Sequence, residues 1–238
     1  MSRQFIRSPP VALDTGVEQM IGIGVHRAVR DRVRSDILRG RIAGGTRLHQ
    51  SDLAQAYGVS ITPVREALRD LAAEGLVDFT PYSGAVAHQP TLVEVEQIYE
   101  IRSCLAPLSV RGAVLLITPE ELDAADELVT SLTQATSREQ WIDGNRRLHH
   151  LLDDASRSPH LAGILRRLGD VSTMYVNISM APDPIRRRGA DEEHRALVAA
   201  FRARDVDLAV SLTIEHFHHT LEMSRARFIA DSGVEEQM

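Results

Sequence analysis

The sequence predicts a mainly α-helical fold of two unequal domains: a small N-terminal domain of three helices with a β-hairpin, and a larger all-α bundle. Apolar residues recur at helical spacing along most of the chain, and glycine and proline clusters divide it into segments of helix length. Strand-like alternation is confined to residues 76–88. A chain of 238 residues that is 43% hydrophobic and 25% charged has enough apolar material for two cores.

Composition excludes several classes of protein. Cys104 is the single cysteine, so neither an intrachain disulfide nor a cysteine-only zinc site can form. No apolar run has the length of a signal peptide or a membrane span, and we therefore expect a soluble, cytoplasmic protein with no membrane partner. Residues 1–90 contain 11 arginines against 9 acidic residues, whereas residues 91–238 contain 16 against 24, so the part better suited to nucleic acid is N-terminal.

The chain is expected to begin with a flexible extension followed by a helix. Residues 1–24 contain Pro9-Pro10 and lack sustained periodicity, which is typical of a mobile segment. Helical spacing then extends from Val25 to Ile42, and Gly44-Gly45 ends the helix. The apolar stripe of this helix consists of Val25, Val29, Val33, Ile37 and Leu38.

Two further helices follow with a very short turn between them. Residues 52–57 predict a helix closed by Gly58, and the next helix begins near Ser60 to Pro63. One face of that helix carries Val64, Ala67, Leu68 and Leu71, and the opposite face carries Thr62, Arg65, Glu66 and Arg69. Two helices joined in this way cross steeply, which is the geometry that lays the second helix in the major groove of DNA.

A short hairpin completes the N-terminal domain, which spans residues 25–90. Leu76 to Phe79 alternates, Pro81 to Gly84 forms a turn, and Ala85 to His88 returns as a second strand. The N-terminal domain is thus predicted to consist of three helices followed by a hairpin.

The C-terminal domain, residues 91–230, is predicted to be helical throughout and to end in a tail at 231–238. Prolines separate its segments, and neither a strand-like run nor a glycine-rich phosphate loop interrupts them. The expected helices span 92–116, 119–134, 138–156, 160–177, 185–203 and 205–229. This pattern is typical of an all-α bundle.

A set of residues at fixed spacing covers the helix-turn-helix. They are Leu53-Ala54, Gly58-Val59-Ser60, Thr62-Pro63-Val64-Arg65-Glu66-Ala67-Leu68 and Gly75-Leu76. In these residues the chain resembles the GntR family of winged helix-turn-helix regulators. The resemblance implies contacts to a double-stranded DNA operator from Arg34, Thr62, Arg65 and the wing turn at Gly84, and helical geometry adds Arg69. One departure is Ile61, where the family often has arginine, and the lost basic contact should alter operator preference or weaken phosphate binding.

Histidines gather in the C-terminal domain, where seven of the ten lie at or beyond residue 149. Asn145 and His149 are one helical turn apart and can converge on one ion. Together with Ala155-Ser156, Glu193-His194-Arg195-Ala196, Asp205 and His216, they resemble the FCD-type ligand-sensing domain of one GntR subfamily, an all-α bundle of six to seven helices. The resemblance implies a divalent metal ion (Zn, Ni or Mn) held by Asn145, His149, His194 and His216, and a small carboxylate effector held with its help.

Several assignments within this site stay open. Asn145 stands where many members of the family have aspartate, and an amide brings no negative charge, so affinity for a hard cation should fall. Asp153, one turn after His149, is a local replacement, and His219 competes with His216 for the last ligand position. Arg102 matches an arginine that faces the effector carboxylate in the family, with a surface salt bridge as the alternative.

These observations predict a ligand-responsive, DNA-binding transcription regulator, most simply a homodimeric repressor on an inverted repeat. A metal-ion sensor is one alternative, and it would respond to the ion alone. A metal-dependent enzyme with a DNA-binding head is the other, but the chain has no HExxH motif, no nucleophile elbow and no general base beside the histidines. The effector, the operator and the choice between repression and activation do not follow from the sequence.

Overall fold

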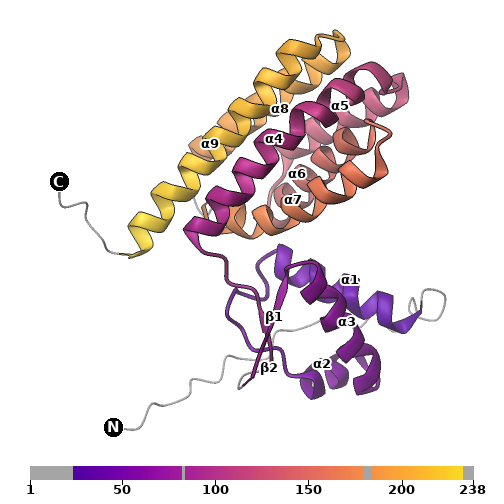
Figure 1. Cartoon of the computed structure of the whole chain (residues 1–238), viewed down its shortest axis with the longest axis vertical. Helices are drawn as coiled ribbons and strands as arrows, with labels where there is room; N and C mark the ends of the chain where they lie inside the picture. Colours follow the sequence, from indigo (N-terminus) through magenta and orange to yellow (C-terminus); the bar gives the residue numbers. More distant parts are fainter. Residues whose placement is uncertain (1–23, 82–83, 180–183, 233–238) are drawn as a thin grey trace. The chain divides into compact units, whose positions relative to one another are not determined.

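A computed structural model describes residues 24–81, 84–179 and 184–232 (Figure 1). In chain order the elements are α1 Val25–Leu38, α2 Gln50–Tyr57, α3 Ile61–Ala73, β1 Val77–Thr80, β2 Gly84–Ala87, α4 Leu92–Leu116, α5 Pro119–Gln134, α6 Arg138–Asp154, α7 Pro159–Ser179, α8 Pro184–Arg202 and α9 Val206–Ser232. The chain divides into two compact units, one ending at His88 and one beginning at Gln89, with Leu38–Gly40 grouped with the second. The mainly α-helical fold with a small hairpin, expected from the sequence, is confirmed.

The first unit is a helix-turn-helix followed by a wing. Gly58 closes α2 in the left-handed conformation, at φ 64°, and its N–H caps carbonyls of the last turn. The turn is short, and α3 begins three residues after Gly58, at Ile61. β1 and β2 then pair antiparallel, with Val77 opposite Ala87 and Thr80 opposite Gly84. A core packs these elements together through Val29, Val33, Ile37, Leu53, Val64, Leu68, Leu71 and Leu76.

The first helix is shorter than the sequence predicts. It ends at Leu38 rather than Ile42, because Gly40 adopts φ 72° and turns the chain back. The N–H of Ile42 then donates to the carbonyl of Asp36. The side chain of Asp36 is fully buried and accepts hydrogen bonds from Arg41 and from the hydroxyl of Tyr57. Apolar spacing beyond residue 38 therefore reflects packing of the returning loop and not a further helical turn.

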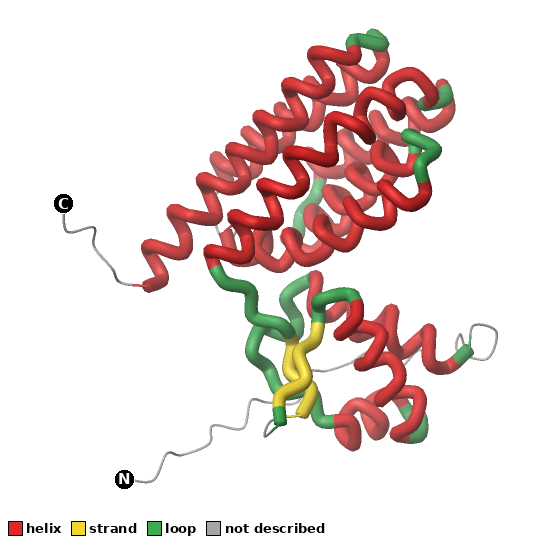
Figure 2. The backbone as a smooth tube through the Cα atoms, in the orientation of Figure 1, coloured by secondary structure: helices red, strands yellow, loops and turns green. Residues whose placement is uncertain are grey.

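The second unit is a bundle built by α4 to α9 (Figure 2). The long helices α4 and α9 lie side by side, and α5 packs against α6 and α8. Capping boxes at Thr118 and Ser137 satisfy the first N–H groups of α5 and α6, which explains why these two helices begin where the sequence predicts. The last helix continues to Ser232, so residues 231 and 232, expected in the tail, are helical.

Parts of three predicted segments lie outside the described residues. They are the N-terminal extension up to residue 23, the hairpin turn at residues 82 and 83, and the tail from residue 233. Within the described ranges, no single helix has the length and hydropathy needed to cross a membrane.

Candidate functional site

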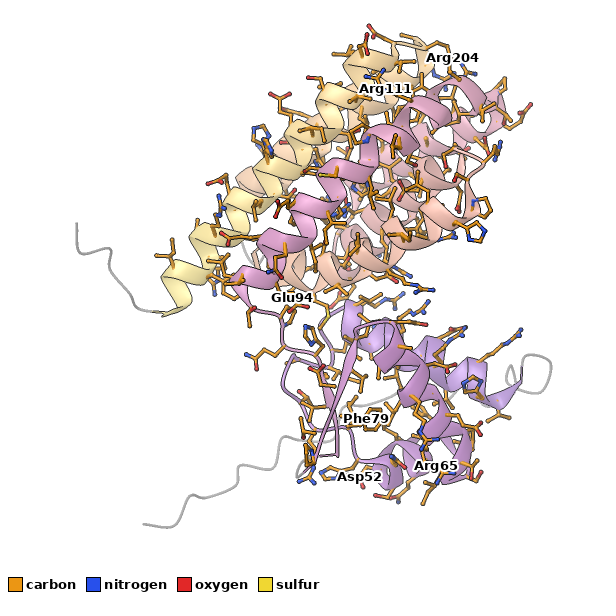
Figure 3. All side chains as sticks on the ribbon, in the orientation of Figure 1. Asp52, Arg65, Phe79, Glu94, Arg111 and Arg204 are labelled. Atoms are coloured by element: carbon orange, nitrogen blue, oxygen red, sulfur yellow. The ribbon has the colours of Figure 1, made fainter. Side chains whose placement is uncertain are left out.

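Helix α3 presents the residues that the sequence predicts for DNA contact on one exposed face. Thr62, Arg65 and Arg69 are exposed, whereas Val64 and Leu68 on the opposite face are fully buried. Neither Arg65, labelled in Figure 3, nor Arg69 forms an ion pair with any residue in the described ranges. Both guanidinium groups are therefore available to an external acceptor.

Apolar side chains flank this face. Ile61, the first residue of α3, is 51% exposed, so the departure from arginine leaves a hydrocarbon side chain where a cation was expected. On the wing, Phe79 of β1, labelled in Figure 3, is 48% exposed. Gly84, the first residue of β2, is also exposed. Ile61 and Phe79 are not among the residues predicted to contact DNA. Periodicity places them in a helix and a strand, but it does not predict whether their side chains are covered.

Arg34 differs from the other predicted DNA contacts. Its guanidinium forms an ion pair with Glu74, the residue that follows α3, and its side chain is only 25% exposed. This pair ties α1 to the end of α3, so the charge of Arg34 is already partly neutralised within the protein.

In the bundle, three predicted metal ligands from three helices come together. His149 of α6, His194 of α8 and His216 of α9 have ring centroids 4.8–5.3 Å apart. Their ligating atoms lie within 4.8 Å of one another, and His194 is fully buried. His219 lies outside this cluster and its side chain is 50% exposed, so the geometry favours His216 over His219 as the ligand from α9.

A carboxylate orients the histidine from α9. Glu193 pairs with Nδ1 of His216 at 2.7 Å and with Nδ1 of His219 at 2.8 Å. Metal-binding histidines usually direct their second ring nitrogen to such a carboxylate, which fixes the tautomer and the ring orientation. Glu193 thus leaves Nε2 of His216 for the cluster.

The donor set fits a divalent metal ion. Asn145, one turn before His149, is 92% buried, and its Oδ1 accepts no hydrogen bond within the described part of the chain. A buried acceptor without a donor costs about 1–3 kcal/mol, and a cation offers it compensation. An amide oxygen with three imidazole nitrogens is a set that zinc and related divalent ions accept.

Burial also sets the protonation of this site. It lowers the pKa of His149 well below its usual value, and the neighbouring His216 and His194 reinforce the effect. The imidazole is therefore neutral near pH 7, which is the form that binds a metal. Burial raises the pKa of Asp153 to about 7. Asp153 lines the same cavity but lies outside the histidine cluster, so the structure does not bring the proposed local replacement into the ligand set.

Arg102 lines the same cavity as His149 and His216. Its side chain is 92% buried and its guanidinium stacks on Phe217, 4.1 Å from the ring centroid, and on Tyr99 at 5.2 Å. Nη1 donates to Oγ of Ser172 at 3.2 Å, and no carboxylate of the described residues pairs with it. A surface salt bridge, the alternative from sequence, is therefore wrong for Arg102.

The cavity itself opens between α4, α6, α7, α8 and α9. Its space, including the opening to solvent, is about 650 Å³, and Arg102, Asn145, His149 and His216 all line it. At its edge Nε of Arg146 donates to Asp170, with His150 nearby. Tyr99, Ser172 and Phe217 also belong to the site, but a helical stripe alone cannot distinguish them from ordinary core residues.

Comparison with known proteins covers both units. Residues 26–86 match the bacterial regulatory proteins of the gntR family, and residues 97–219 match the FCD domain. The chain is 27% identical to an HTH-type transcriptional regulator, YdhC, of Bacillus subtilis, over 81% of this chain and 87% of that protein. It is also 27% identical to a probable D-xylose utilization operon transcriptional repressor of Paenarthrobacter nicotinovorans, over 94% and 97%. The solved structure of Escherichia coli McbR/YncC matches with a TM-score of 0.79 at 25% identity, over 87% of this chain and 99% of that one.

Proposed function

The chain belongs to the gntR family of bacterial regulatory proteins and carries an FCD domain, and we propose that it is a homodimeric repressor released from DNA by a small carboxylate. The family and the named relatives are regulators of transcription, so the reading as an enzyme with a DNA-binding head is set aside. The repressor acts in the cytoplasm, where its double-stranded operator, an inverted repeat, is found.

The DNA-reading part of the proposal assigns contacts to Thr62, Arg65 and Arg69 of α3 and to the wing at Gly84. Exposure of this face, with two arginines one turn apart and without ion pairs in the described residues, supports it. Arginine binds a guanine edge or a phosphate with two parallel hydrogen bonds. Arg34 stays a predicted contact, with its pair to Glu74 as a competitor.

The observation that carries the sensing part is the buried guanidinium of Arg102. A buried cation without a paired carboxylate is costly, and an anionic ligand removes that cost by supplying the missing charge. Ser172 and the rings of Phe217 and Tyr99 hold the guanidinium in place for this role. Asn145, His149, His194 and His216 would hold the divalent ion, which adds positive charge and Lewis acidity beside the carboxylate.

Arg102 also argues against the alternative in which the protein senses the metal ion alone. A fixed positive charge in the same cavity lowers the affinity of the histidines for a cation, so it is a disadvantage in a pure metal sensor. The same charge is an advantage where an anion has to bind beside the metal.

The effector test measures operator affinity with and without acid. The protein, loaded with metal, is first used to select operator fragments from random double-stranded DNA, and fluorescence anisotropy then follows binding during titration with small carboxylates. We expect an acid that binds the protein to weaken operator binding about 100-fold, which corresponds to about 2.7 kcal/mol of coupling. The Arg102→Met variant keeps the apolar stem of the side chain and should bind DNA normally while no longer responding.

Two outcomes would contradict this proposal. An acid that binds tightly and leaves DNA affinity unchanged excludes the coupling. Release of DNA by the metal ion alone, with no further effect of any acid, supports the metal-sensor alternative.

An apolar stripe on α4 supports the homodimer. Ile101, Leu108 and Leu115 are 46%, 64% and 68% exposed and recur every seven residues, the spacing at which side chains line one face of a packed helix pair. A two-fold dimer would bury the same stripe of each copy and present two α3 helices to an inverted repeat.

The Leu108→Glu variant is therefore expected to shift the protein from dimer to monomer in sedimentation velocity and to weaken operator binding with it. A charge buried at the centre of the interface in both copies is the reason. Ile164→Glu is the matched control, because Ile164 is 48% exposed on α7, outside the stripe. A Leu108→Glu protein that stays dimeric at micromolar concentration would exclude this face.

A further inference from the structure

A second cavity adjoins the one that His149 and His216 line. Its space, including any opening, is about 400 Å³, and its walls come from the five helices α4, α6, α7, α8 and α9. Apart from the residues that it shares with the first cavity, the lining is almost entirely hydrocarbon: Ala106, Val110, Leu152, Leu197, Phe201, Thr213 and Phe217. The hydroxyl of Thr213 already donates to the carbonyl of Ala209 at 2.8 Å.

Arg102 and His149 stand at the boundary, because they line both cavities together with Asp153 and Leu165. Phe217 stacks on the guanidinium of Arg102 and forms a wall of the second cavity. An anion that pairs with Arg102 therefore has polar groups on one side and an apolar lobe on the other. We call this second cavity the apolar lobe.

We propose that the effector is a monocarboxylate whose hydrocarbon substituent occupies the apolar lobe. This inference rests on the proposed function, in which Arg102 holds the carboxylate, and it adds the chemical class of the rest of the ligand. A second carboxylate or several hydroxyl groups would enter a space with almost no hydrogen-bond partners, and buried polar groups left unpaired lose affinity strongly. A hydrocarbon group gains affinity there by leaving water.

The chemistry of the boundary supports the same class of ligand. Asp153 is the carboxyl that both cavities share, and it lies close enough to Arg102 for the guanidinium charge to act on it. A second anionic group placed beside Asp153 would meet another carboxyl. One negative charge, matched to one guanidinium, is what the boundary accommodates.

The experiment measures affinity against chain length with straight-chain acids from acetate to hexanoate on metal-loaded protein, by isothermal titration calorimetry. We expect affinity to rise about fourfold for each added CH₂ until the lobe is filled. Succinate and glutarate should bind more weakly than butanoate and pentanoate, the monocarboxylates of equal length.

Two substitutions at Val110 test whether the lobe is responsible. Val110 lines the apolar lobe alone and is 93% buried. Val110→Ala enlarges the lobe and should move the best chain length upward, whereas Val110→Phe fills it and should move the best length downward. Val129→Ala is the control of equal volume change, because Val129 is buried on α5 and lines neither cavity.

The outcomes separate this inference from the proposed function. If the acids bind but their affinity does not change from acetate to hexanoate, the apolar lobe is overturned and the proposed carboxylate sensor is unaffected. The same holds if the best chain length does not move in either Val110 variant. If Val110→Phe fails to fold in a thermal melt, the direction of the Val110→Ala shift decides alone. Absence of binding for every acid overturns the proposed function and this inference together.

Discussion

Replacing Arg65 by alanine is expected to abolish sequence-specific operator binding while leaving the fold intact. The side chain is exposed on α3 and forms no ion pair with the described residues, so its removal should change the free energy of unfolding by no more than about 0.5 kcal/mol. A bidentate contact to guanine contributes about 1–3 kcal/mol of discrimination. A dimer loses two such contacts, or about 2–6 kcal/mol, which lowers affinity between about 30-fold and about 20,000-fold.

Anisotropy on the selected operator and on a scrambled duplex separates base reading from phosphate binding. Loss of a base contact weakens the operator complex far more than the scrambled one, whereas loss of a phosphate contact weakens both and lowers the salt dependence. Arg188→Ala, an equal change at an exposed position of α8, should leave both affinities unchanged. Operator binding by Arg65→Ala at wild-type affinity would mean that the recognition face is assigned wrongly.

The second large effect is expected in the metal content of a His149→Ala/His194→Ala protein. Untagged wild-type protein, purified without chelator, should contain close to one divalent ion per chain by elemental analysis, and the double variant should contain none. Two of three clustered imidazoles are lost, and apparent binding free energies of about 10–16 kcal/mol at four-ligand zinc sites make each ligand worth several orders of magnitude in affinity.

Matched variants make this measurement specific. His219→Ala removes a histidine outside the cluster and should keep the metal, which also tests the choice of His216. Glu193→Gln removes the carboxylate behind His216 and should weaken metal binding about 10–100-fold without abolishing it. Absence of metal from the wild-type protein would mean that Asn145 marks a metal-free pocket, with Arg102 as the anchor of the ligand.

Much of the fold follows from local sequence signals. The start of α5 at Pro119 and of α6 at Arg138 is readable because Thr118 and Ser137 are capping residues with Glu121 and Gln140 three positions later. The end of α1 cannot be predicted in this way. Ile42 fits the apolar stripe of the helix, but its N–H donates to the carbonyl of Asp36 across a turn that follows the helix. The spacing of apolar residues predicts which side chains are buried, but it does not predict where the backbone leaves the helix.

The site is predictable in its residue types and less so in its contacts. Asn145 and His149 are neighbours on one helix, so their convergence can be read from spacing, whereas His194 and His216 join them only through the packing of α8 and α9. The partners of Arg102, which are Ser172 on α7 and Phe217 on α9, are far from it in sequence. Helical periodicity predicts that such residues are buried, but not which side chains they meet.

The origin of the three histidines on three different helices has a consequence for the lifetime of the protein. An ion bound by His149, His194 and His216 would crosslink α6, α8 and α9. Because these histidines come together only in the folded chain, the ion would bind the native state and not the unfolded one. Free metal at 100 times its dissociation constant would stabilise the native state by about 2.7 kcal/mol through mass action. Starvation for the metal would then loosen the bundle, expose it to proteolysis and lower the amount of regulator in the cell, independently of any effector.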